Sequence, residues 1–256
     1  MSKIAEAFQN KKAFITYLMA GDPNLEKSAE NILAAQEAGA DLIEIGIPFS
    51  DPIAEGPVVE NASVRALSSG VRLNHVFDMV ASLKGKITVP LVFMTYLNPV
   101  FVYGYERFFK KCSEIGISGI IIPDLPFEEQ QEVKVVAKKY GIQIITLIAP
   151  TSKERIKKIA ENAEGFIYLV SSMGVTGVRS EITTDIPAII NQIREVINIP
   201  VAVGFGINKP GQVKEYAKIA DGVIVGSGIV RLVEKYGEEA RDPIFQYVQE
   251  MQAELR

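Results

Sequence analysis

The chain has 256 residues, 48% of them hydrophobic, and its 31 acidic and 27 basic side chains leave a net charge of −4. This composition indicates a globular protein and excludes one that binds nucleic acid through a field of positive charge. The single cysteine, Cys112, excludes an internal disulfide, so we expect a cytoplasmic protein. No apolar run approaches the roughly 18 residues of a membrane span, so no membrane association is expected.

Eight short apolar runs follow one another along the chain. They are AFITYL at 13–18, DLIEIGI at 41–47, LVFMTY at 91–96, GIIIP at 119–123, QIITLIA at 143–149, GFIYLV before Ser171, VAVGFG at 201–206 and GVIVGS at 222–227. Between them, stretches such as EEQQEVKVVAKKYG place apolar residues three and four apart, as amphipathic helices do. Because the runs are apolar almost throughout, we expect a parallel sheet with helices packed against it.

The alternation of strand and helix predicts the fold. Units such as GADLIEIGIP, GISGIIIP and ADGVIVGSG share a local pattern, which indicates one repeated strand–helix unit. Eight such units predict an α/β fold with a single (β/α)₈ TIM-barrel domain over residues 1–256. Extra helices are expected before the first strand and after the eighth. An open doubly wound sheet is the alternative, but no G-x-G-x-x-G motif follows the first strand.

One ionisable group lies inside the second predicted strand, where Glu44 interrupts Leu, Ile and Gly. Burying even a neutral polar group without a partner costs roughly 2–7 kcal/mol, so Glu44 is either paired in the core or functional. Active sites of such barrels lie at the carboxyl ends of the strands. A carboxyl group there has a raised pKa, which lets it give and take a proton near neutral pH.

Glycines gather after the last three predicted strands, in GVTG at 174–177, GFG at 204–206 and GSG at 226–228. Backbone N–H groups in such loops can converge on an anion, and barrels commonly bind phosphate after strands seven and eight. The sequence therefore predicts a ligand that carries phosphate. The alternative is that these glycines only form tight turns.

Other chemistries are disfavoured by the residues that are missing from the predicted strands. The chain has one histidine, His75, and no cluster of His and Cys with metal-ligand spacing, so no metal site is expected. A magnesium site on Asp22 and Asp51 is a weak alternative. No lysine lies in any of the eight runs, which argues against Schiff-base chemistry and leaves proton transfer to carboxylates and tyrosines.

The stretch EIGIPFSDPIAEGP, followed by VVENASVRAL, resembles the signature of the tryptophan synthase alpha chain family. The likeness continues in YLMAGDP, FMTYLNPV, IIPDLPFEE, SSMGVTGVR, VGFGI and DGVIVGSGIV. It implies a lyase of tryptophan biosynthesis that cleaves indole-3-glycerol phosphate by retro-aldol chemistry to indole and glyceraldehyde 3-phosphate. It also implies an α₂β₂ complex with a beta chain that carries pyridoxal phosphate, and no cofactor on this chain.

The resemblance also implies roles for individual residues. Glu44 would be the acid–base catalyst, and Glu55 would hold the indole N–H, although the family usually has aspartate at that position. Substrate-binding positions would be Tyr17, Met94, Tyr96, Tyr168, Thr176 and Phe205. Phosphate-binding positions would be Gly177, Gly204, Gly206, Gly226 and Ser227. The beta-chain contact would include Pro48, Phe49, Asp51, Pro52, Asn98, Pro99 and Phe101.

Two other functions remain open at this point. A phosphate-binding barrel isomerase or epimerase would share the glycine loops and a carboxylate base. Alternatively, the chain would be mainly an activating subunit whose own site is weakened by the glutamate at position 55.

Overall fold

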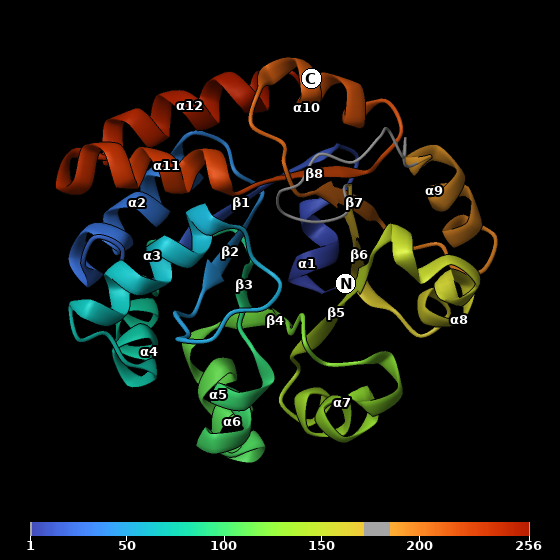
Figure 1. Ribbon diagram of the computed structural model, residues 1–256, viewed down its shortest axis with the longest axis horizontal. Coiled ribbons are helices and arrows are strands. Elements are labelled where there is room, and N and C mark those ends of the chain that lie inside the picture. Colours follow the sequence, from blue (N-terminus) through green and yellow to red (C-terminus); the bar gives the residue numbers. More distant parts are fainter. Residues whose placement is uncertain (1, 172–184, 256) are drawn as a thin grey trace.

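The computed structural model describes residues 2–171 and 185–255, and Figure 1 shows them arranged as a barrel surrounded by helices. Eight parallel strands pair in chain order, and β1 (Ala13–Met19) closes the barrel by pairing with both β2 (Leu42–Gly46) and β8 (Gly222–Val225). The predicted (β/α)₈ barrel is therefore confirmed, and the open doubly wound sheet is excluded.

All eight strands overlap the apolar runs of the sequence. The remaining five are β3 (Leu91–Met94), β4 (Ile117–Ile121), β5 (Gln143–Ile148), β6 (Glu164–Val170) and β7 (Val201–Gly204). Most of their residues are buried on both sides of the sheet, by the outer helices and by the barrel interior. A strand in this position cannot alternate apolar and polar residues, which explains the near-continuous apolar runs.

The helices form an outer ring around the strands (Figure 1). They are α2 (Leu25–Glu37), α3 (Pro57–Ser68), α4 (Leu73–Ser82), α5 (Leu97–Tyr103), α6 (Tyr105–Ile115), α7 (Gln130–Lys139), α8 (Ile156–Ala160), α9 (Ile186–Arg194), α10 (Pro210–Ala217) and α11 (Ser227–Tyr236). Short 3₁₀ helices span Phe127–Glu129, Pro150–Arg155 and Gly237–Glu239. None of the helices in the described residues is long and apolar enough to cross a lipid bilayer.

Two further helices lie where the sequence predicts additions to the barrel. The first is α1 (Lys3–Ala7), which Ser2 caps and whose Ile4 is fully buried beside Gly119 and Gly165 of the barrel. The second is α12 (Arg241–Ala253), which follows α11 and packs against α2. In Figure 1 α1 is seen through the centre of the barrel, and it covers the end at which the strands begin.

The barrel interior is filled by one cluster of buried side chains that includes Ala13, Ile15 and Leu42. Side chains two residues apart on a strand face the same side. The same periodicity therefore directs Tyr17 and Glu44, which pair across β1 and β2, into the interior at the carboxyl ends of those strands. The packing of an ordinary barrel core thus determines where the exceptional carboxyl group lies.

Candidate active site

Glu44 is held at the barrel mouth by the pairing of β2 with β1 on one side and with β3 on the other. It is 1% exposed, and its Oε1 atom has no hydrogen-bond partner among the described residues. Burial raises the pKa of this carboxyl group to about 8. At neutral pH Glu44 is therefore mostly protonated and can donate a proton.

Two buried tyrosines, Tyr17 and Tyr168, also line the cavity that contains Glu44. Each ring lies against a glycine: a Cβ atom on Gly46 would come within 2.1 Å of the Tyr17 Oη, and one on Gly204 within 2.6 Å of the Tyr168 Oη. Burial raises the pKa of both phenols well above the ordinary value, so both remain neutral hydrogen-bond donors. The Tyr17 hydroxyl has no partner within the described chain.

Glu55 lies at the end of the loop that joins β2 to α3, directly before the helix cap Gly56. Burial raises the pKa of its carboxyl group to about 7, and the negative charge of Glu60 adds to the effect. Its Oε2 atom is buried and, among the described residues, unpaired. Burial thus raises the pKa of both carboxyl groups toward neutrality, so each can exchange a proton near pH 7.

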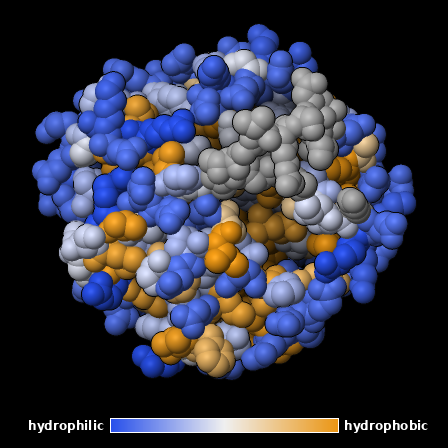
Figure 2. Space-filling model, in the orientation of Figure 1, coloured by the Kyte–Doolittle hydropathy of each residue, from blue (hydrophilic) through white to orange (hydrophobic). Residues whose placement is uncertain are grey.

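Glu44 and Glu55 both line one cavity of about 210 Å³ at the mouth of the barrel. Figure 2 shows a hollow in this view with hydrophobic side chains at its border. Nine of the predicted site residues line the cavity: Tyr17, Glu44, Glu55, Met94, Tyr168, Phe205, Gly206, Gly226 and Ser227. Gly204 and Tyr96 do not line it, and Thr176 and Gly177 lie outside the described residues.

Phe205 has an unusual backbone conformation for a residue with a side chain. Its φ angle is +82°, a region that costs a non-glycine residue of order 1–3 kcal/mol and that is commonly found at functional sites. The Ser171 hydroxyl donates a hydrogen bond to the Phe205 carbonyl oxygen, and Gly204 and Gly206 flank the residue. This local conformation places Phe205 at the cavity wall.

The amino end of α11 faces the cavity, since Gly226 caps this helix and Ser227 is its first residue. The free N–H groups and partial positive charge at a helix start favour an anion. Arg231 also lines the cavity and adds a full positive charge. Arg231 is not among the residues predicted from the sequence, although its position four residues after Ser227 places both on one face of the helix.

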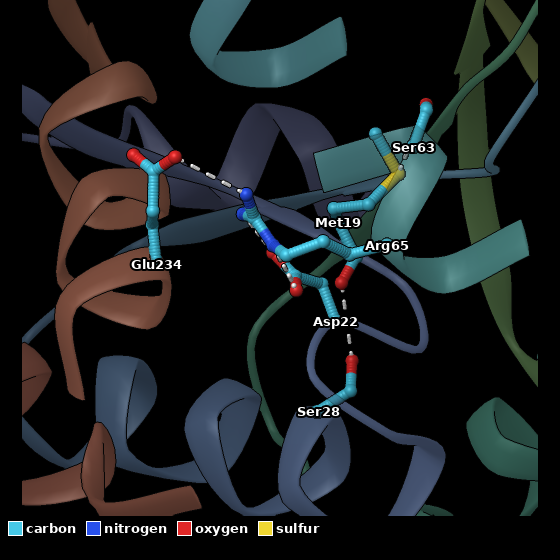
Figure 3. A network of polar contacts seen from close by, with 6 residues as sticks. All are labelled: Met19, Asp22, Ser28, Ser63, Arg65 and Glu234. Atoms are coloured by element: carbon cyan, nitrogen blue, oxygen red, sulfur yellow. Dashed lines mark hydrogen bonds and ion pairs between the residues drawn. The ribbon is translucent and has the colours of Figure 1, made fainter. Parts of the chain in front are cut away.

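A polar network fixes α3, the helix that follows Glu55 (Figure 3). The Asp22 carboxylate, 2% exposed, accepts hydrogen bonds from the Arg65 Nε at 2.9 Å and from an Arg65 terminal nitrogen at 2.7 Å. Arg65 also contacts Glu234 of α11 at 3.4 Å. Asp22 thus serves as the anion partner of Arg65, whereas Asp51 is exposed and accepts a hydrogen bond from the Ser50 hydroxyl.

The residues predicted to contact a partner differ in exposure. Asp51, Asn98 and Phe101 are exposed, whereas Phe49, Pro52 and Pro99 are half-buried and Pro48 is buried. Two further apolar side chains, those of Ile53 in the same loop and Val102 on α5, are 79% and 75% exposed. Of these two, Ile53 is also predicted from the sequence to lie on a covered surface, whereas Val102 is not.

A larger depression of about 980 Å³ lies at the opposite end of the barrel, where the strands begin. Its charged groups already have partners: Lys11 pairs with Asp41, and Arg194 pairs with Asp221. It holds no carboxyl group comparable to Glu44. The smaller cavity at the carboxyl ends is therefore the candidate active site.

The fold and this site define an α/β-barrel enzyme with two titratable carboxyl groups at its mouth. The family model described as "Tryptophan synthase alpha chain" matches residues 4–256. The alpha chain of Lacticaseibacillus casei is 48% identical over 98% of this chain and 94% of its own length. The alpha chain of Bacillus cereus is 46% identical over 93% of both chains.

Solved structures agree with this assignment. The tryptophan synthase alpha subunit from Legionella pneumophila superposes with a TM-score of 0.90 at 33% identity, over 100% of this chain and 98% of that one. A chain of the tryptophan synthase α₂β₂ complex from Pyrococcus furiosus gives a TM-score of 0.87 at 36% identity, over 95% and 99%. The chain belongs to the tryptophan synthase alpha chain family. This membership confirms the predicted function, a carbon–carbon lyase of tryptophan biosynthesis that cleaves indole-3-glycerol phosphate.

The raised pKa of Glu44 predicts how stability depends on pH. The unfolded chain releases this proton near pH 4.5, whereas the folded chain keeps it until about pH 8, so stability present at low pH is lost as pH rises between these values. Glu44→Gln cannot ionise, so its free energy of unfolding should improve relative to wild type by roughly 1 kcal/mol per pH unit. Urea unfolding at about pH 5 and about pH 8 measures this difference. The exposed Glu239→Gln is the control, and parallel pH dependence of Glu44→Gln and wild type would contradict the prediction.

Proposed function

We propose that Glu44 is the acid–base catalyst of indole-3-glycerol phosphate cleavage in this chain. The supporting observation is a carboxyl group that is 1% exposed, has a pKa raised to about 8 and lines the cavity at the barrel mouth. A general acid works best when its pKa lies near the operating pH. Glu44 therefore holds a proton at neutral pH and can also take one back.

The proposed reaction uses Glu44 twice. Its protonated carboxyl group donates a proton to C3 of the indole ring, which leaves positive charge on the ring. The resulting carboxylate then removes the proton from the hydroxyl group on the carbon attached to C3. The bond between that carbon and C3 breaks, its electron pair restores the indole ring, and glyceraldehyde 3-phosphate leaves as the aldehyde. Glu44 ends in its starting protonation state.

We propose that the Glu55 carboxylate accepts a hydrogen bond from the indole N–H and stabilises the positive charge that develops on the ring. Two observations support this role. Glu55 lines the same cavity as Glu44, and the pKa of its carboxyl group is about 7, so part of the population is ionised at neutral pH. Tyr17, Met94, Tyr168 and Phe205 form much of the apolar and aromatic wall and would enclose the ring. Thr176 stays a proposed substrate-binding residue from the sequence resemblance, and it lies outside the described part of the chain.

The phosphate group would bind at Gly206, Gly226 and Ser227, where α11 begins, with Arg231 nearby. Gly177 is retained in this proposal from the sequence resemblance, although it lies outside the described residues. Gly204 would contribute indirectly, because its missing side chain makes room for Tyr168. The proposed phosphate site would thus share one cavity with Glu55.

We also propose a partner chain, an assembly and a cellular location for the enzyme. The chain would bind a beta chain through the surface around Ile53, Phe101 and Val102, whose side chains are 65–79% exposed. The complex would be an α₂β₂ assembly, like the tryptophan synthase complex of Pyrococcus furiosus. Pyridoxal phosphate would belong to the beta chain, with no cofactor on this chain, and the complex would work in the cytoplasm.

The first activity test removes the titrating group of Glu44 while nearly keeping its volume. Glu44→Gln should release indole from indole-3-glycerol phosphate roughly 10²-fold more slowly than wild type, because general acid–base catalysis is lost. Circular dichroism checks that the variant folds, and the exposed Glu239→Gln should match wild type. Undiminished indole release by a folded Glu44→Gln would rule out Glu44 as the catalyst.

The second activity test asks whether glutamate at position 55 is fully functional. The side chain lines the cavity, so shortening it in Glu55→Asp should lower indole release several-fold by withdrawing the carboxylate. Glu55→Gln should lower it further, because the amide cannot balance positive charge on the ring. Both are measured with saturating beta chain. A several-fold gain in Glu55→Asp would instead show that the native site is misaligned and that the chain is mainly an activating subunit.

The partner surface is tested by adding charge to it. Phe101→Asp should lower the fraction that co-elutes with a beta chain from the same source on gel filtration, because a carboxylate would be buried in an apolar contact. Val135→Asp, on the exposed face of α7, is the matched control, since Val135 is 60% exposed and Phe101 is 65% exposed. Equal co-elution of the two variants would remove the α5 surface from the proposed contact.

A further inference from the structure

Tyr96 follows β3 and caps α5; it does not line the cavity and is only 2% exposed. Its hydroxyl oxygen accepts hydrogen bonds from two backbone N–H groups, that of Ile53 at 3.1 Å and that of Ala54 at 3.0 Å. Its ring packs against Phe49, with 5.2 Å between the ring centres. These three contacts all belong to the loop that carries Glu55.

This loop has few other attachments to the barrel. Between Pro48 and Glu55, the backbone N–H groups with a hydrogen bond to another described residue are those of Ile53 and Ala54, and both bonds end on the Tyr96 oxygen. A hydroxyl oxygen can accept two hydrogen bonds, so both of its acceptor sites are filled. The Tyr96 oxygen is therefore the polar anchor of the described loop immediately before Glu55.

The other side of Glu55 is fixed by a different contact. Gly56 caps α3, and Arg65 of that helix binds the buried Asp22 at the end of β1 (Figure 3). Glu55 thus lies between a helix tied to β1 and a loop tied to β3. Removing either attachment would let the carboxylate move relative to Glu44, which is part of the rigid strand β2.

We propose that Tyr96 is a positioning residue, whose hydroxyl group sets the place of the Glu55 carboxylate by anchoring the backbone of Ile53 and Ala54. This inference rests on the proposed role of Glu55 and differs from the substrate contact that the sequence resemblance implies for Tyr96. Catalytic groups lose activity steeply when displaced, so an anchor of this kind acts on the rate.

Loss of the anchor would also change the surroundings of Glu55. The charged and titratable groups around it are Glu60 on α3, Tyr17 on β1, Glu44 on β2 and Arg231 on α11, together with Tyr96 itself. Burial of Tyr96 raises its pKa to about 12, so the hydroxyl stays neutral across the working pH range. A loosened loop admits water to Glu55, which relieves the burial that raises the pKa of its carboxyl group.

The test uses Tyr96→Phe, which deletes only the oxygen and keeps the ring against Phe49. We expect kcat for indole release to fall about tenfold, with KM within about twofold of wild type, because a displaced Glu55 weakens stabilisation in the transition state rather than ground-state binding. The acidic limb of the pH profile should move to lower pH by about one unit as Glu55 becomes hydrated. Tyr140→Phe, which removes a hydroxyl that donates a hydrogen bond to Glu106 of α6, should change none of these values.

A second readout does not depend on activity. The chain contains no tryptophan, so Ile53→Trp adds a single fluorophore to the exposed loop position. Adding Tyr96→Phe to this reporter should lower its fluorescence anisotropy, whereas adding Tyr140→Phe should not. Ala54→Pro, which deletes one of the two donors and leaves Tyr96 intact, should lower kcat in the same way.

Two results would overturn the inference. A rise in KM with unchanged kcat in Tyr96→Phe would make Tyr96 a substrate contact, and unchanged anisotropy would show that the hydroxyl does not anchor the loop. If wild type released no indole even with a beta chain, the proposed function would fail. The anisotropy comparison would still show whether the Tyr96 hydroxyl anchors the loop.

Discussion

The proposed chemistry of this site depends on the burial of the Glu44 carboxyl group inside a closed parallel barrel. The strands of such a barrel are covered on both sides, so a side chain that points inward has no access to bulk water except through the mouth. An ionised carboxylate at this position has no cation beside it among the described residues, and burial is the cause that raises its pKa. The barrel therefore keeps the group protonated at neutral pH without a dedicated partner.

The space around this carboxyl group is made by glycines on the strands as much as by the residues that line it. Gly46 and Gly204 admit the rings of Tyr17 and Tyr168, and a methyl group at either position would occupy the space of a phenol. Both phenols stay neutral because they are buried. These two rings give the cavity a neutral aromatic wall, while its positive charge comes from Arg231 and from the start of α11. This separation suits a flat apolar ring at one end and a phosphate at the other.

Much of this arrangement can be predicted from the sequence, because the relevant signals are local. Short apolar runs identify all eight strands, and a carboxyl group within such a run marks Glu44 as exceptional. The Tyr96 contact could not be predicted in this way, since its partners are backbone N–H groups in another loop and leave no side-chain pattern. The burial of Pro48 is likewise set by tertiary packing. Helical spacing from Ser227 could have identified Arg231, but the glycine pattern already explained an anion site without a cation.

Residue type alone does not show whether Glu55 can do the work of the aspartate that is usual at this position in the family. A glutamate where aspartate is usual suggests a misplaced carboxylate, yet the side chain lines the same cavity as Glu44. Its backbone is set by Tyr96 before it and by the start of α3 after it. Loop geometry of this kind decides whether one extra methylene is compensated, and only a structure describes it.

The most direct test of the central claim is the protonation state of Glu44 in the free protein. The infrared difference spectrum between wild type and Glu44→Gln, recorded across neutral pH, isolates the carboxyl signal of this one residue. The account predicts a protonated carboxyl stretch at pH 7 that converts to a carboxylate signal around a pKa of about 8. A Glu44 that is already a carboxylate at pH 6 would contradict the account, because it could not then serve as the proton donor at neutral pH.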